Sequence, residues 1–173
     1  NRKTNGAQCL FFSPYSGNGH KPYIYDFEAF STDENSLESQ FVSNTLKTHK
    51  GQCRSLPWMY KILAKEIDAD VSLAHAPRHC YIMYKDEDNI TPEKWINLEV
   101  TANQMVPTWW IKKDFEICDS AIVAGTYMTP LTDAETIASQ MADLAFGYWK
   151  KFNRYDEFTY YCTSRSLEFY PMN

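Results

Sequence analysis

A glycine, a cysteine and a proline within seven residues constrain this chain more than any other feature. The segment reads Gly51-Gln-Cys-Arg-Ser-Leu-Pro57, and apolar side chains then recur at helical spacing up to Ile67. Proline is tolerated only in the first turn of a helix, so the pattern predicts a helix over 54–67 with Cys53 at its start. The free N–H groups and the positive dipole end of that turn stabilise an anion. We therefore expect the thiolate form of Cys53 to be favoured, as in a nucleophile.

The part of the chain before this helix gives weaker signals. Residues 1–21 show little periodicity and contain several glycines, so they predict a loop, and residues 23–27 predict a short extended piece. Ser31-Thr-Asp-Glu34 has the spacing of a capping box, and the apolar pattern after it predicts a helix over 33–49. Gly51 is expected to end that helix in the left-handed conformation.

Strand signals follow the central helix. Residues 71–76 and 79–84 are short apolar runs, and residues 94–100 alternate between apolar and polar side chains. The acidic turn 86–89 joins the second run to the third, which predicts an antiparallel hairpin. Residues 102–119 are aromatic-rich and are expected to be irregular. A helix packed on an antiparallel sheet makes the predicted fold class α+β. The alternation places Ile96, Leu98 and Val100 on one face of the third strand and Trp95, Asn97 and Glu99 on the other.

Residues 131–173 predict two helices. Thr132-Asp-Ala-Glu135 is a second capping box, and a strong amphipathic stripe continues to Phe152. Asn153-Arg154 is expected to turn the chain, and residues 155–170 support one more helix. Residues 131–173 are therefore expected to form a helical hairpin packed on a domain formed by residues 1–130.

A cysteine nucleophile needs a base to take its proton and a group that orients the base. His79 is the candidate base, because it opens a strand just after a helix and a turn. Glu99 or Asn97 could orient it, since both lie on the polar face of the strand predicted to pair with the His79 strand. The order Cys53, His79 and then an acidic or amide side chain predicts a triad that spans a helix start and two adjacent strands.

Three segments together resemble the core motifs of the transglutaminase-like superfamily, in particular its bacterial members. They are Gly51-Gln-Cys-Arg-Ser-Leu-Pro57, Ala76-Pro-Arg-His-Cys-Tyr-Ile82 and Trp95-Ile-Asn-Leu-Glu-Val-Thr101, and the resemblance covers residues 48–105. It implies a papain-like α+β core in which Cys53 is the nucleophile, His79 the base and Glu99 the orienting acid. The family usually has Asp where this chain has Glu99, and many members have an aromatic residue where it has Arg54.

The resemblance implies attack of the Cys53 thiolate on an amide, from a peptide bond or a glutamine side chain, to give a thioester. The backbone N–H of Cys53 and the side chain of Gln52 would donate to the oxyanion. Asn97 is a further candidate there, and Trp109 and Trp110 could line the substrate cleft or belong to the core. Water as acceptor gives a peptidase or amidase, and an amine gives cross-linking. No metal or cofactor is required.

The net charge and the composition limit the classes of partner that this chain is expected to bind. The net charge is −5 without a basic tract, which argues against nucleic acid, and no apolar run approaches the roughly 18 residues of a membrane span. The chain starts at Asn1 rather than Met, so removal of a leader or lipid anchor is compatible with the sequence. The resemblance then implies an extracytoplasmic bacterial location and a protein or peptide substrate. Some members of the fold have lost catalysis, so the alternative is an inactive binding or scaffold domain.

The cysteines and histidines allow one other interpretation, namely a metal site. The five cysteines are scattered without a CxxC pair, which argues against a structural zinc site. His75, His79 and Cys80 could form a metal site, but Pro77 breaks the helical spacing that two such histidines would use.

The C-terminal hairpin has a looser resemblance, to a single tetratricopeptide repeat. The segments concerned are Leu144-Ala-Phe-Gly-Tyr148, Arg154-Tyr-Asp-Glu157 and Ser166-Leu-Glu-Phe-Tyr-Pro171. Their register differs from the repeat by about one residue, so an ordinary helical hairpin is an equal alternative.

Overall fold

A computed structural model describes residues 2–14, 16–32 and 37–172 of the chain. The chain divides into two compact units, Asn1–Pro130 and Leu131–Asn173. Within the described residues, no helix combines the length and the apolar character needed to cross a membrane.

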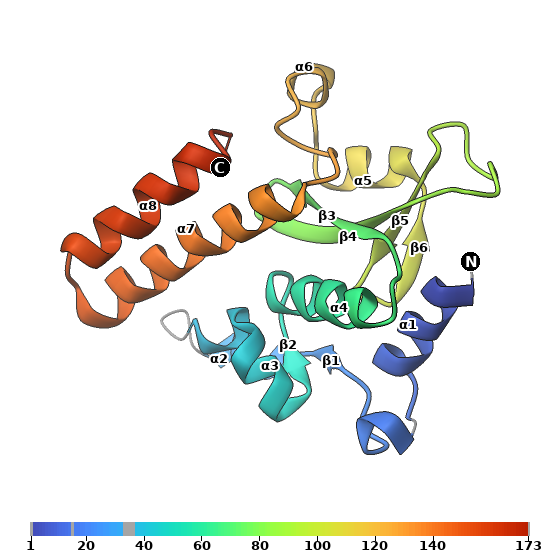
Figure 1. Ribbon diagram of the computed structural model, residues 1–173, viewed down its shortest axis with the longest axis horizontal. Coiled ribbons are helices and arrows are strands. Elements are labelled where there is room, and N and C mark those ends of the chain that lie inside the picture. The colour runs from blue at the N-terminus through green and yellow to red at the C-terminus, as the bar shows by residue number, and fades with distance from the viewer. Residues whose placement is uncertain (1, 15, 33–36, 173) are drawn as a thin grey trace. The chain divides into compact units, whose positions relative to one another are not determined.

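A four-stranded antiparallel sheet forms the centre of the first unit (Figure 1). Its strands, in spatial order, are β3 (Val71–Ala76), β4 (His79–Lys85), β5 (Trp95–Glu99) and β6 (Gln104–Val106). The predicted hairpin and the α+β class are confirmed, and Ile82 pairs with both Leu73 and Leu98 in a fully buried row. The strand β6 was not expected, because three residues next to a proline carry too short a pattern.

Helices cover both sides of this sheet (Figure 1). On one side α4 (Ser55–Glu66) packs against β3 and β4 and buries Leu56, Met59 and Tyr60, which confirms the predicted buried helix. On the other side lies α5 (Thr108–Asp114), in the stretch that the sequence predicted to be irregular. This helix forms because the fully buried Ile111 joins an apolar cluster with side chains of β3 and β4, a tertiary contact that the local sequence does not reveal.

The N-terminal region holds more helix than expected. Its elements are α1 (Arg2–Phe12), η1 (Ser16–Asn18), β1 (Ile24–Tyr25), α2 (Phe27–Thr32), η2 (Glu38–Gln40), α3 (Val42–Thr48) and β2 (Lys50–Gly51). The predicted loop over 1–21 is therefore wrong for α1. Ala7 and Phe11, four residues apart, are buried, and Phe11 makes an edge contact with Tyr60 of α4 at 5.4 Å between ring centroids. This packing stabilises a helix whose own sequence favours it weakly.

The segment before the central helix also differs from its prediction. The predicted capping box extends into residues 33–36, outside the described residues, and the expected helix 33–49 is represented by η2 and α3. His49, with φ of 58°, ends α3 in the left-handed conformation, so the expectation that Gly51 does so is wrong. Gly51 instead belongs to β2, which pairs in parallel with β1.

The second unit is a helical hairpin formed by α7 (Asp133–Phe152) and α8 (Glu157–Phe169). The capping box is confirmed: the Thr132 N–H donates to Glu135 Oε2 at 2.8 Å, and the Glu135 N–H donates to Thr132 Oγ1 at 3.2 Å. Tyr148 packs against Phe158 with ring centroids 4.7 Å apart, which joins the two helices close to their connection.

Candidate active site

Cys53 lies where β2 passes into α4. The first helical hydrogen bond of α4 runs from the Leu56 N–H to the Gln52 carbonyl at 3.0 Å, so Cys53 occupies the turn whose N–H groups have no intrahelical acceptor. The thiol is partly exposed and donates weakly to the Arg78 carbonyl, with a sulfur–oxygen distance of 3.9 Å. Helix α4 thus presents the Cys53 thiol to the turn that precedes His79.

His79 is the first residue of β4 and follows a two-residue turn. Ala76 pairs with His79 across the turn, which consists of Pro77 and Arg78. Arg78 has a φ of 56°, and a proline followed by a residue with positive φ is typical of a type II turn. This conformation is unusual for a residue with a Cβ, and here it brings the His79 strand back beside Cys53.

Glu99, the last residue of β5, holds the far side of the His79 ring. The His79 Nε2–H donates to Glu99 Oε2 at 2.6 Å, and the two side chains are only 12% and 5% exposed. The backbone N–H and the hydroxyl of Thr101 donate to Glu99 Oε1 at 3.0 and 2.6 Å. Both carboxylate oxygens are therefore engaged, and Thr101 is a supporting residue that the sequence did not single out.

The protonation of His79 follows from these contacts. Burial alone would lower the pKa of His79, but hydrogen bonds to the Cys53 and Glu99 side chains outweigh it and raise the pKa from 6.5 to about 9. The site thus favours an imidazolium between a sulfur and a carboxylate at neutral pH.

An aromatic side chain that the sequence did not single out covers the His79 ring. Phe115, at the C-terminal end of α5, stacks on the His79 ring with centroids 4.6 Å apart and an interplanar angle of 18°. Trp110 makes an edge contact with Phe115 at 6.4 Å. A π-face over an imidazolium is attractive, so Phe115 supports the charged form of His79. The only sequence signal for it was the aromatic richness of residues 102–119.

The other candidate residues take different positions. Gln52 is buried directly before Cys53. Asn97 is 2% exposed and donates to the Val106 carbonyl at 3.4 Å and to Thr108 Oγ1 at 3.3 Å, so its amide joins β5 to β6 and to the start of α5. Trp110 packs in the apolar cluster beside Phe115, whereas Trp109 is 63% exposed. Their roles toward a substrate stay predictions.

The alternative metal site is not formed. Strand alternation places Cys80 on the face of β4 opposite to His79, and Cys80 is buried there. Across the described part of the chain, no group of three or more His, Cys, Asp or Glu side chains could hold a metal ion.

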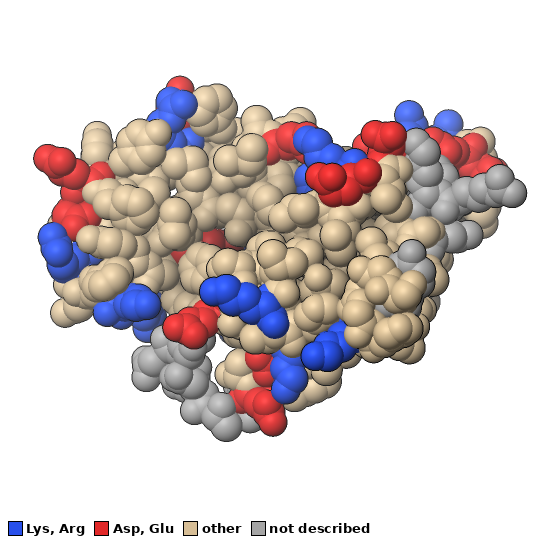
Figure 2. Space-filling view, turned by 60° about the horizontal axis from the view of Figure 1, so that its bottom comes forward, with Lys and Arg blue, Asp and Glu red and all other residues tan. Residues whose placement is uncertain are grey.

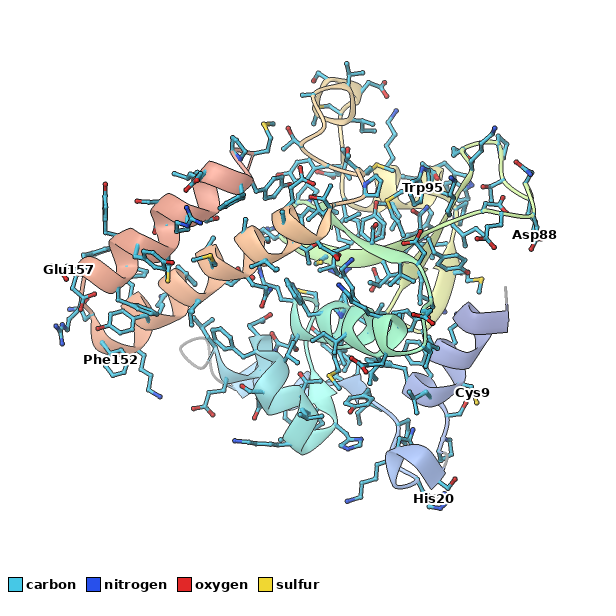
Figure 3. The ribbon with its side chains drawn as sticks, in the orientation of Figure 1. Cys9, His20, Asp88, Trp95, Phe152 and Glu157 are labelled. Carbon is cyan, nitrogen blue, oxygen red and sulfur yellow. The ribbon has the colours of Figure 1, made fainter. Side chains whose placement is uncertain are left out.

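In Figure 3, Asp88 marks the exposed end of the β4–β5 connection, and Trp95 marks the point where β5 begins.

Searches of protein-family models, curated proteins and solved structures found no match to this chain.

The elevated pKa of His79 predicts a titration that can be measured. In histidine NMR spectra, the His79 ring should titrate near pH 9, and Cys53→Ala should move the midpoint down because one interaction that raises the pKa is lost. His75 is the internal control, because burial and the nearby Arg54 charge lower its pKa to about 4. A wild-type midpoint near 6.5 would contradict the assigned contacts.

The same shift has a consequence for stability. The folded-state pKa of His79 lies above the value of 6.5 for an unfolded chain, so protonation of His79 stabilises the fold fully below pH 6.5. That contribution is lost as the pH rises through about 9.

Proposed function

We propose that this chain is a cysteine acyl-transfer enzyme with a transglutaminase-like, papain-type core. The observation that carries the proposal is the position of His79, which lies close enough to the Cys53 side chain for that side chain to raise its pKa and which donates to Glu99 Oε2 at 2.6 Å. A nucleophile, a base and an orienting acid in this order are the parts that thiol-dependent acyl transfer requires. Glu99 can replace the aspartate that is usual in the transglutaminase-like superfamily, because both side chains are carboxylates.

The proposed reaction has two steps. In the first, the Cys53 sulfur bonds to the carbonyl carbon of an amide, and the developing oxyanion accepts hydrogen bonds from the Cys53 backbone N–H and the Gln52 side chain. The C–N bond then breaks, and the imidazolium of His79 gives its proton to the leaving amine. In the second step, water or an amine attacks the thioester while His79 takes up its proton, and the Cys53 thiolate is released.

The proposed substrate is a protein or peptide, in an extracytoplasmic bacterial compartment. Trp110 and Phe115 would form an apolar wall beside the reacting atoms, which suits an extended chain with apolar side chains. Positive and negative side chains are interspersed on the face that Figure 2 shows, an arrangement without the clustered basic side chains that a nucleic acid requires. The competing function, an inactive binding domain, would leave Cys53 without enhanced reactivity.

Thiol labelling tests the proposal. Iodoacetamide at neutral pH, followed by peptide mass spectrometry, should modify Cys53 faster than the other four cysteines, and p-nitrophenyl acetate should acetylate it. Both reactions at this site should disappear in Cys53→Ala. The matched control is Cys118→Ala, because Cys118 is exposed and its pKa is lowered by hydrogen bonds from Ser120 and the local backbone. Equal labelling of Cys53 and Cys118, or acetylation that survives Cys53→Ala, would favour the binding domain.

A further inference from the structure

A short segment far from Cys53 in the sequence fixes the backbone directly before it. The Gln52 N–H donates to Ser55 Oγ at 3.0 Å and to the Ser39 carbonyl at 3.3 Å. The Ser55 hydroxyl in turn donates to the same Ser39 carbonyl at 2.5 Å, and its side chain is completely buried. The helix η2, which contains Ser39, is thereby joined to the first turn of α4, and the main chain of Gln52 has one defined position.

The next residue of η2 fixes the Gln52 side chain. Gln40 Nε2 donates a hydrogen bond to Gln52 Oε1, and Gln52 is only 7% exposed. A carboxamide carries one acceptor and two N–H donors. With Gln40 donating to Oε1, the Nε2–H groups of Gln52 are the donors that it can offer to a further partner, and a developing oxyanion is a partner that needs donors.

We infer that Gln40 is a positioning residue that orients the Gln52 carboxamide so that its Nε2–H serves the oxyanion formed at Cys53. The inference rests on the proposed function, because it assigns a role within the same acyl transfer. Gln40 does not contact the reacting atoms. It acts through Gln52, by favouring the orientation in which the Gln52 oxygen points to Gln40 and not to the negative charge.

The experiment compares two reactions of the same thiol. Acetylation by p-nitrophenyl acetate forms a sulfur–carbon bond, expels p-nitrophenolate and passes through an oxyanion, whereas alkylation by iodoacetamide displaces iodide without one. Gln40→Met, which keeps the size and removes the donor, should slow acetylation of Cys53 about 10-fold, while Gln52→Ala should slow it about 100-fold. Alkylation should change less than about twofold in both variants. Gln140→Met, at a half-buried glutamine on α7, is the matched control.

A double variant separates positioning from general damage. If Gln40 acts only through Gln52, then Gln40→Met added to Gln52→Ala should cause no further loss of acetylation rate. A further 10-fold loss in the double variant, unchanged acetylation in Gln40→Met, or parallel losses of acetylation and alkylation would each overturn the inference. The proposed function fails by a different result, namely a wild-type protein in which Cys53 is neither preferentially alkylated nor acetylated.

Discussion

His79→Asn should lower the rate of Cys53 acetylation by about 10²–10⁴-fold, the usual contribution of a positioned general acid–base group. Asparagine cannot take up or give back the proton that the proposed reaction requires. Stopped-flow release of p-nitrophenolate measures the effect. His20→Asn is the matched control, because His20 is exposed and has a φ of 60°, a conformation that asparagine also adopts.

The role of Glu99 can be tested with the same p-nitrophenolate assay. Glu99→Gln removes the negative charge but keeps an oxygen that can accept from His79 Nε2, so the acetylation rate and the His79 titration midpoint should both fall. A wild-type acetylation rate in His79→Asn would remove the basis of the triad. If Glu99→Gln lowers the acetylation rate but leaves the titration midpoint of His79 unchanged, then only the electrostatic role of Glu99 is contradicted.

Gly51→Ala should be the most destabilising small substitution in this region, by about 1–3 kcal/mol of unfolding free energy, as for other overpacked sites. A Cβ at this position would lie 2.5 Å from both Ser55 Oγ and Thr45 Oγ1 and 3.2 Å from Leu56 Cγ. Thr45 and Ser55 are completely buried and cannot move aside freely. Because Ser55 also holds Gln52, the substitution should slow acetylation as well as lower stability.

Urea unfolding of two variants measures this effect. Gly6→Ala is the matched control, since its added Cβ would lie 3.6 Å from Ile67 Cδ1, an ordinary contact, and alanine is the better helix former by roughly 0.5–1 kcal/mol. Gly6→Ala should therefore be neutral or stabilising. A Gly51→Ala protein as stable as the wild type would show that the close approach of α3 and α4 is not required.

Local patterns in the sequence predicted the elements that carry Cys53, His79 and Glu99. Helix α4, the strand pair β4–β5 and the capping box of α7 each have several residues at consistent spacing, and all three occur in the structure. Cys53, His79 and Glu99 could be proposed because each lies at the end of such an element. Helix α1 could not be predicted, since its formation depends on the contact of Phe11 with Tyr60, far along the chain.

The structural roles of Gly51 and Phe115 could not be predicted from local sequence patterns. Gly51 was expected to adopt a left-handed conformation, whereas the structure requires it for the close approach of α3 and α4. A glycine required for a close approach looks the same in sequence as one required for a turn. The stacking of Phe115 on His79 joins residues 36 positions apart, and no short-range spacing encodes it.

That stacking makes the surroundings of the His79 ring dependent on a small helix. Phe115 is carried at the end of α5, a seven-residue helix in which Ile111 is the only fully buried side chain. Such an element opens locally at a lower free energy than the sheet beneath it. Exchange of the His79 ring proton with solvent would then report how often α5 opens, long before the strands that hold the triad separate.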